Sequence, residues 1–316
     1  MMSIPSGISV IIPVYNSAVT LHELINQLGT VLPTLASSYE AILINDGSRD
    51  KSWEIIQEIC KTTPWVRGVN MMRNYGQHNA LVCGMRLASF DITVTMDDDL
   101  QHPPAEIHKL LSPLAEGNDV VYGIPKKLPH SWWRNVFSRM TKRILAMVMG
   151  IPTIRDIGAF RAFRTEIRRA SDLFQSPTVI LDVLLSWGTT RFATVEVDEA
   201  PRQVGHSNYN FSRLVSQALL ILTGFSTVPL RMTNWLGFIA TFFGFLVLLY
   251  VLIQYFMAGS IPGFPFLASL VAIFSGVQLF ALGIFGEYLA RIFDRSMERP
   301  TYVISEQISS LKDKSS

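Results

Sequence analysis

Three consecutive carboxylates, residues 97–99, directly follow a short run of strand-forming residues at 92–96. Adjacent negative charges repel one another, so a compact fold retains all three only where a cation balances them. Divalent metals such as Mg²⁺ are bound by carboxylate oxygens, and in enzymes they commonly bridge to a phosphate. The cluster therefore predicts a metal site that serves chemistry on a nucleotide-activated substrate.

The three aspartates are not expected to face the same way. Side chains alternate between the two sides of an extended chain, which places Asp97 and Asp99 together and Asp98 opposite. The alternative is that one of them caps a helix beginning near Pro103. Because a cap requires only one carboxylate, we favour the metal site.

Strand-forming and helix-forming segments alternate along the first half of the chain. Strands are expected at 8–13, 39–45, 66–71, 92–96 and 119–123, and helices at 18–31, 51–60 and 77–88. This alternation predicts an α/β fold with a mostly parallel sheet and helices on both faces. Ligands bind such sheets beyond the carboxyl ends of the strands. The polar residues at 15–16, 45–48 and 97–99 all follow strands, so we expect them to meet at one edge.

A long segment without ionisable charges sets the second half of the chain apart. No Asp, Glu, Lys or Arg occurs in the 55 residues from Met232 to Gly286, whereas one bilayer crossing requires only about 20 residues. We expect two transmembrane helices, near 234–257 and 265–289. Arginines flank both of them and the loop between them is uncharged, so the positive-inside rule places both chain ends in the cytoplasm.

Two further segments are expected at the membrane surface. Residues 120–155 contain no acidic residue but several Lys and Arg, and a basic amphipathic helix at about 130–149 is typical of a membrane-surface element. The alternative is a helix that packs on the core and exposes its basic face to solvent. A second amphipathic helix is expected at 211–225. The polar tail at 306–316 is expected to be frayed.

Four short motifs occur in an order that resembles a known enzyme family. They are Ile-Ile-Pro-Val-Tyr-Asn at 11–16, Asn-Asp-Gly-Ser-Arg-Asp at 45–50, Arg-Asn-Tyr-Gly-Gln at 73–77 and Met-Asp-Asp-Asp-Leu-Gln-His-Pro at 96–103. Together they resemble glycosyltransferase family 2, whose members have the GT-A nucleotide-sugar fold. With two C-terminal transmembrane helices, the chain resembles the polyprenyl-phosphate glycosyltransferases, such as bactoprenol glucosyltransferases and dolichol-phosphate mannose synthases.

The resemblance implies a site for a nucleotide sugar and a divalent metal. The implied nucleotide-sugar-binding residues are Pro13, Tyr15, Asn16, Asp46, Asp97 and Asp98. The implied metal, Mg²⁺ or Mn²⁺, would be bound by Asp97, Asp99 and Gln101.

Asp46 has two possible tasks. It can accept a hydrogen bond from a pyrimidine or a ribose, but Asp46 and Asp50 are also suited to cap the helix that follows. We assign nucleotide binding to Asp46 and capping to Asp50. Two departures from the family pattern, Ser17 where Glu is frequent and Asn45 where Asp is frequent, leave the identity of the base open.

The resemblance also implies catalytic residues for transfer to a phosphate. The candidates are Asp156, Asp99 and Arg202. A phosphate monoester is already ionised at neutral pH, so no strong base is required and Asp156 would orient the acceptor. The alternative for Asp156 is a salt bridge with Arg155 or Arg161.

An acceptor that is a lipid phosphate requires cations close to the membrane. Arg202, together with Ser207 and Tyr209 in the loop that follows, is expected to bind the acceptor phosphate, since Arg suits bidentate phosphate binding. The alternative is a polar surface loop without this role.

These expectations define three parts of the chain and one activity. Residues 1–230 would form a cytosolic GT-A domain, 231–292 a two-helix transmembrane domain and 293–316 a cytosolic tail. The enzyme would transfer a single sugar from a UDP-sugar, UDP-glucose foremost, to polyprenyl (undecaprenyl) phosphate. Transfer would take place at the cytosolic face of the cell membrane and would invert the anomeric centre.

Two other functions compete with this one. A processive polysaccharide synthase of the same superfamily usually carries a Gln-x-x-Arg-Trp motif, which this sequence lacks. A membrane scaffold or lipid flippase would have no need for the intact acidic cluster. The net charge of +2 says little by itself; no nucleic-acid partner is expected, and a homo-oligomer is left open.

Overall fold

The computed structural model describes residues 7–126, 158–170, 172, 174–176, 179–200, 227–258 and 263–309. The chain divides into two compact units. The first comprises Met1–Asn210 together with Glu298–Ser316, and the second comprises Phe211–Met297. The last residues of the chain therefore belong to the first unit, although the second unit separates them from it in sequence.

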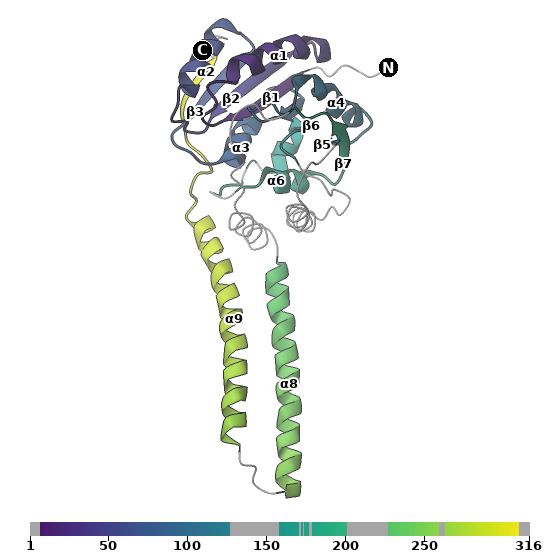
Figure 1. Cartoon of the computed structure of the whole chain (residues 1–316), viewed down its shortest axis with the longest axis vertical. Helices are drawn as coiled ribbons and strands as arrows, with labels where there is room; N and C mark the ends of the chain where they lie inside the picture. The colour runs from purple at the N-terminus through teal and green to yellow at the C-terminus, as the bar shows by residue number, and fades with distance from the viewer. Residues whose placement is uncertain are drawn as a thin grey trace. The chain divides into compact units, whose positions relative to one another are not determined.

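An eight-stranded sheet forms the centre of the first unit (Figure 1). Its strands are β1 (Ile8–Val14), β2 (Tyr39–Asn45), β3 (Val66–Met71), β4 (Ile92–Thr95), β5 (Val120–Pro125), β6 (Arg161–Arg164), β7 (Phe192–Val197) and β8 (Ile304–Ser309). Their order across the sheet is β7-β5-β6-β4-β1-β2-β3-β8. The central pairs β4–β1, β1–β2 and β2–β3 are parallel, whereas β6 and β8 run antiparallel to their neighbours. The predicted α/β fold with a mostly parallel sheet is confirmed.

The neighbouring strands β1 and β2 are buried on both faces. All seven residues of β1 and six of the seven in β2 are buried, which is typical of strands covered by helices on both sides. Ile8, Val10 and Ile12 of β1 join one apolar cluster. Ile11 points to the opposite face, where a Cβ added to Gly84 of the covering helix would lie 2.3 Å from its Cγ2 atom.

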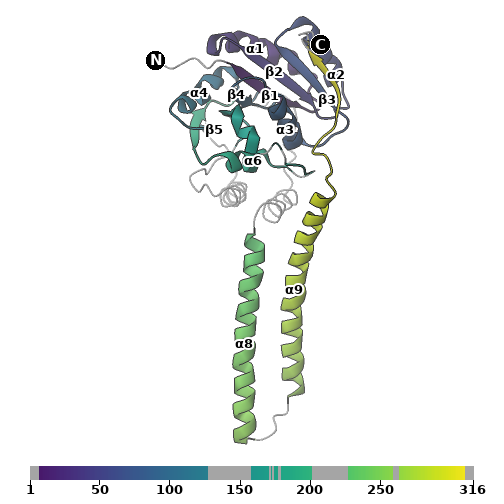
Figure 2. The same ribbon diagram turned by 180° about the vertical axis from the view of Figure 1, so that it is seen from behind.

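Helices cover both faces of the sheet (Figure 2). They are α1 (Leu21–Leu35), α2 (Ser52–Thr62), α3 (Gln77–Leu87), α4 (Ile107–Ala115) and α6 (Leu181–Gly188), with short 3₁₀ helices at Pro104–Glu106 and Thr165–Ala170. In α1, the fully buried leucines 21, 24, 28 and 32 recur at helical spacing and form its core-facing side. The three predicted helices correspond to α1, α2 and α3, and α6 was not predicted. A helix beginning near Pro103, considered only as an alternative, corresponds to the 3₁₀ helix and α4, and no side-chain hydrogen bond caps either one.

The C-terminal tail differs from its sequence-based expectation. A frayed tail from residue 306 is wrong as far as Ser309, because Ile304–Ser309 forms β8 and pairs antiparallel with β3. Ile304 and Ile308 are half-buried, and Ile308 packs against the apolar core. The polar residues between these two isoleucines conceal the strand in the sequence.

The second unit contains two long apolar helices, α8 (Val228–Ala258) and α9 (Phe264–Ser296). Within them, Val228–Met257 and Ile273–Ser296 have mean hydropathies of 2.6 and 1.5 and are long enough to cross a membrane. The helices approach closely at Gly244, where an added Cβ would lie 2.9 Å from the Phe274 ring. Both predicted apolar helices are present, and each extends beyond its predicted bounds.

Candidate active site

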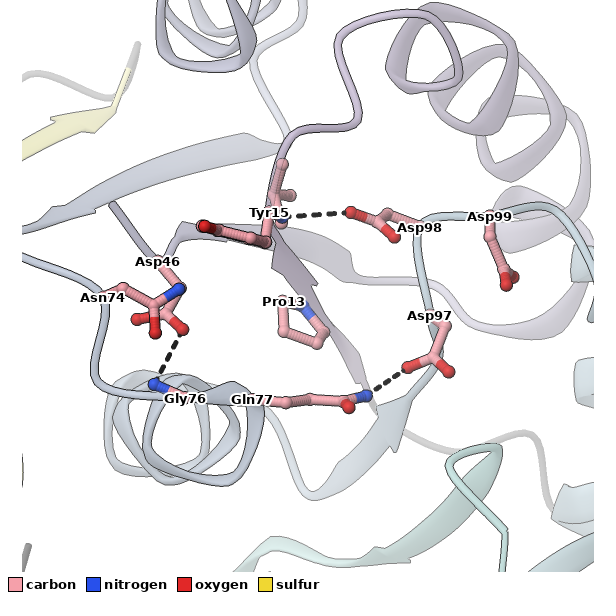
Figure 3. Close-up of a pocket in the computed structure, with 10 residues that line it drawn as sticks. Pro13, Tyr15, Asp46, Asn74, Gly76, Gln77, Asp97, Asp98 and Asp99 are labelled. Atoms are coloured by element: carbon pink, nitrogen blue, oxygen red, sulfur yellow. Dashed lines mark hydrogen bonds between the residues drawn. The ribbon is translucent and has the colours of Figure 1, made fainter. Parts of the chain in front are cut away.

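A pocket of about 260 Å³ lies beyond the carboxyl ends of β1, β2, β3 and β4. Its lining residues are Pro13, Val14, Tyr15, Asp46, Asn74, Gly76, Gln77, Asp97, Asp98 and Asp99 (Figure 3). All four sequence motifs contribute to this lining. They meet because parallel strands carry their carboxyl ends to the same edge of the sheet.

The Asp46 carboxylate holds the loop that leads from β3 into α3. Its two oxygens accept backbone hydrogen bonds from Tyr75, at 2.7 Å, and from Gly76, at 2.8 Å. Burial raises the pKa of Asp46, although these two hydrogen bonds oppose the rise. At the start of α2 it is Asp50 that accepts the N–H of Ser52, at 3.0 Å, in agreement with the helix-terminus role expected for it.

A glycine next to Asp46 allows two loops to approach each other. Gly47 has a φ of 65°, in the left-handed region that side chains disfavour. A Cβ at this position would also lie 2.5 Å from the backbone nitrogen of Asn74. Both constraints require glycine here, and they fix the loop after β2 against the loop after β3.

Asparagine side chains tie the strand ends together. Asn16 has a φ of 56°, its N–H donates to Ser48 Oγ at 3.0 Å, and its Oδ1 accepts the N–H of Arg49 at 2.8 Å. Asn45 donates from Nδ2 to Oδ1 of Asn70 at 2.7 Å. Asn16 and Asn45 are not among the residues that line the pocket, so they shape it through the loops that they join.

The middle aspartate faces the first strand. Asp98 accepts the backbone N–H of Tyr15 at 3.3 Å and turns toward it in Figure 3. Burial raises the pKa of Asp98; hydrogen bonds from Ser17 and Tyr15 oppose this effect, and the neighbouring charge of Asp99 adds to it. The Tyr15 side chain is 46% exposed, so its ring is available to stack on a base.

The outer two aspartates extend from the loop in a different direction from Asp98 (Figure 3). Asp97 accepts a hydrogen bond of 2.6 Å from the Gln77 amide, and Asp99 accepts the backbone N–H of Gln101 at 3.1 Å. Leu100, which lies between Asp99 and Gln101, has a φ of 61° and a buried side chain. Backbone strain at a non-glycine residue is common at functional sites, and here it accompanies the turn that separates Asp99 from Gln101.

The donor set fits a metal that protein and substrate hold jointly. Among the residues that the structure describes, no three His, Cys, Asp or Glu side chains are grouped closely enough to hold an ion by themselves. Mg²⁺ is typically bound through one or two carboxylates plus substrate phosphates. Asp97 and Asp99, both at the pocket wall, provide two such carboxylates. Gln101, the third predicted ligand, is not among the lining residues.

Several predicted residues lie outside the described part of the chain. They are the candidate catalytic and acceptor-binding residues Asp156, Arg202, Ser207 and Tyr209, and the amphipathic segments at 130–149 and 211–225. Arg161, one candidate partner of Asp156, forms a buried ion pair with Asp182. Asp182 also accepts the Tyr122 hydroxyl hydrogen at 2.8 Å.

Besides Val14, three lining residues from the loop after β3 were not predicted as site residues, namely Asn74, Gly76 and Gln77. All three belong to the motif at 73–77, which served only to support the family resemblance. A polar motif directly after a predicted strand is the signal that points to them, because the loop after β3 reaches the same sheet edge as the loops after β1, β2 and β4.

Comparison with known proteins agrees with this geometry. Residues 9–170, about half of the chain, match the family model for glycosyl transferase family 2. Among solved structures, the fold is similar to that of glucosyl-3-phosphoglycerate synthase from Mycobacterium tuberculosis in several complexes. The complex with Mn²⁺, UDP and phosphoglyceric acid has a TM-score of 0.51 at 21% identity, with 68% of this chain and 76% of that chain covered. The complex with Mg²⁺ and UDP has a TM-score of 0.50 at 21% identity, with the same coverage. The chain therefore belongs to glycosyl transferase family 2 and has the GT-A fold.

Proposed function

We propose that this enzyme transfers a single sugar from a UDP-sugar, UDP-glucose foremost, to polyprenyl phosphate. The observation that carries the proposal is the presence in one chain of a family 2 pocket and of two helices apolar enough to cross a membrane. An acceptor that is itself confined to the bilayer suits such an enzyme. Tethering the enzyme and its acceptor to one surface removes much of the entropic cost of bringing them together.

The pocket residues support a nucleoside diphosphate donor. Tyr15 offers an exposed ring to the base, and the Asp46 carboxylate and the loop that it orders lie beside it. The similar synthase binds UDP together with Mn²⁺ or Mg²⁺. By analogy, we assign UDP and one of these metals to this pocket.

Asp97 and Asp99 would hold the metal, and Gln77 would keep the Asp97 carboxylate in place through its amide. A bound Mg²⁺ or Mn²⁺ supplies positive charge that stabilises the departing diphosphate. Asp98, turned toward the Tyr15 backbone, contributes to the shape of the donor pocket instead.

The reaction is a direct displacement at the anomeric carbon. An oxygen of the lipid phosphate attacks that carbon opposite the diphosphate, the bond to the diphosphate breaks, and its electron pair leaves with UDP. A single attack from the opposite side inverts the configuration. The lipid phosphate is already ionised at neutral pH, so we assign Asp156 to orienting the acceptor, and Arg202, Ser207 and Tyr209 to binding its phosphate.

We further propose that α8 and α9 cross the cell membrane and that both chain ends lie in the cytoplasm. The uncharged connection between the helices and the arginines outside them support this orientation. The donor pocket would then face the compartment in which nucleotide sugars are made.

The proposal is tested by incubating the full-length enzyme in lipid nanodiscs with radiolabelled UDP-glucose, Mn²⁺ and polyprenyl phosphate. We expect one labelled glucose per lipid in the butanol-extractable fraction, and none without the lipid phosphate. Labelled polymer would indicate a processive synthase. Lipid translocation without sugar transfer would indicate a flippase, and either result would contradict the proposal.

A further inference from the structure

The segment 301–309, which follows α9 in the chain, contacts both elements that flank the nucleotide loop. We use this name for residues 72–76, which connect β3 to α3. On the β3 side, β8 pairs with the strand over several residues, including Val69 with Gln307 and Met71 with Ile304. The ladder reaches the loop itself, because the N–H of Met72 donates to the carbonyl oxygen of Val303 at 2.9 Å.

On the α3 side, the contact is made by Tyr302. The Arg86 guanidinium lies over the Tyr302 ring, 5.7 Å from its centre, and the Tyr302 hydroxyl shares a hydrogen bond with the Cys83 thiol. Next to it, the buried Thr301 accepts the N–H of Ser176 at 3.4 Å. The segment is therefore docked through specific side chains as well as through the edge of the sheet.

The nucleotide loop between these two attachments shapes much of the pocket. Tyr75 and Gly76 donate their N–H groups to Asp46. Gln77, the first residue of α3, donates to Asp97. The spacing between the end of β3 and the start of α3 therefore sets where Asp46 and the Asp97 carboxylate are held.

We infer that the segment 301–309 positions the nucleotide loop, and that Tyr302 is a positioning residue for donor binding. The segment joins β3 to α3 from outside the pocket, so losing it would release one flank of the loop relative to the other. A chain cut before α8 would then bind nucleotide poorly for a reason unrelated to membrane attachment. The inference rests on the proposed function, since it takes the ligand of the pocket to be a nucleoside diphosphate.

The test uses the full-length enzyme in nanodiscs and compares Tyr302→Leu, Tyr302→Phe and Gln307→Ala. Leucine keeps apolar volume but loses the ring beneath Arg86 and the hydroxyl at Cys83, whereas phenylalanine keeps the ring. Gln307 is an exposed residue of β8 and serves as the control. UDP is titrated in the presence of Mn²⁺ by calorimetry, and sugar transfer is measured over a range of donor concentrations.

We expect Tyr302→Leu to weaken UDP binding and to raise the donor KM about fivefold, with kcat nearly unchanged, because loosening a supporting contact misplaces the loop without removing a reacting group. Tyr302→Phe should bind UDP almost as the wild type does, and Gln307→Ala should be unaffected. Wild-type UDP affinity in a folded Tyr302→Leu enzyme would overturn the inference.

Hydrogen exchange on the wild-type enzyme provides a second test that does not depend on a variant. Coupling between two sites is reciprocal, so UDP and Mn²⁺ should slow amide exchange in residues 301–309 as well as in the nucleotide loop. Slower exchange in the loop alone would overturn the inference. If the wild type binds no UDP at all, the proposed function itself is wrong, which separates the two failures.

Discussion

Gln77 and Asp97 form a hydrogen bond of 2.6 Å that joins the start of α3 to the end of β4. One side chain opens a helix, the other belongs to the acidic loop, and both line the pocket (Figure 3). A carboxylate that binds a metal usually depends on such a partner for its orientation.

Replacing this amide should weaken metal binding. We expect Gln77→Met to raise the concentration of Mn²⁺ required for half-maximal activity about tenfold, since loss of an outer-shell partner typically costs between tenfold and a hundredfold. Thermal stability should change little because Gln77 is exposed. The control is Gln57→Met on α2, away from the pocket lining. Equal Mn²⁺ dependence in both variants would contradict this role.

The outer aspartates should be essential for transfer. Asp97→Asn and Asp99→Asn should each lower the rate about 100-fold, a loss of about 3 kcal/mol of transition-state stabilisation. Chelation should abolish wild-type activity, and added Mn²⁺ should restore it. Glu54→Gln, an exposed change on α2, is the matched control. Wild-type rates in both aspartate variants would remove the metal site from the proposal.

The sequence predicts the elements that have a strong periodic or continuous pattern. β1 and β2 are mostly apolar runs, and the buried leucines of α1 recur at helical spacing. β8 escapes prediction because two half-buried isoleucines among polar residues form no recognisable strand pattern. α6 is short and apolar on most sides, so periodicity does not distinguish it from a strand.

The residues of the site divide in the same way. Some can be recognised from the sequence, and others are brought in by tertiary contacts. Aspartates and tyrosine at strand ends can be recognised from residue type and position, and Asp46, Asp97 and Tyr15 do line the pocket. Their partners depend on packing between distant segments. Arg161, for example, pairs with Asp182, a contact between separate segments that sequence spacing does not reveal.

The two oxygens of Asp46 should both be necessary. In Asp46→Asn, an amide NH₂ would face the N–H of Tyr75 or Gly76, and one partly buried donor would lose its acceptor. We expect a loss of about 1–3 kcal/mol in unfolding free energy together with weaker UDP binding. Chemical denaturation and calorimetry measure the two effects.

Asp50→Asn separates stability from binding. Asp50 accepts backbone hydrogen bonds from Ala18 and Ser52 outside the pocket lining, so its replacement should lower stability by about 1 kcal/mol and leave UDP affinity unchanged. If both variants lose UDP affinity equally, Asp46 has no special role in the pocket.

Acid should weaken the cluster that Asp119 forms with Arg164, Thr189 and Arg191, outside the pocket lining. Burial alone would raise the pKa of Asp119, but hydrogen bonds from Arg191 and Thr189 and the charges of Arg191 and Arg164 outweigh it and lower the pKa below its ordinary value of 3.8. A carboxyl group whose pKa is lowered in the folded state stabilises the protein when the pH is above its ordinary pKa. This stabilisation is lost as the pH falls through the folded-state pKa.

The comparison is made with Asp119→Asn. At neutral pH the variant should be less stable by about 1 kcal/mol. The difference in unfolding free energy between wild type and variant should shrink as the pH is lowered below about 4. A difference that stays constant with pH would show that the Asp119 charge contributes nothing.

A comparison of Gly47→Ala with Gly117→Ala separates the effect of backbone strain from the effect of a steric clash. Both have positive φ, 65° and 101°, so alanine at either position costs about 1–2 kcal/mol of backbone energy. A Cβ at Gly117 meets no atom within 4 Å, whereas one at Gly47 would lie 2.5 Å from the Asn74 backbone nitrogen. Backbone cannot move away as a flexible side chain can, so Gly47→Ala must displace the nucleotide loop.

We expect Gly47→Ala to abolish UDP binding in calorimetry and Gly117→Ala to retain it at similar thermal stability. Retained UDP affinity in Gly47→Ala would mean that the contact between the two loops is not required for the donor pocket.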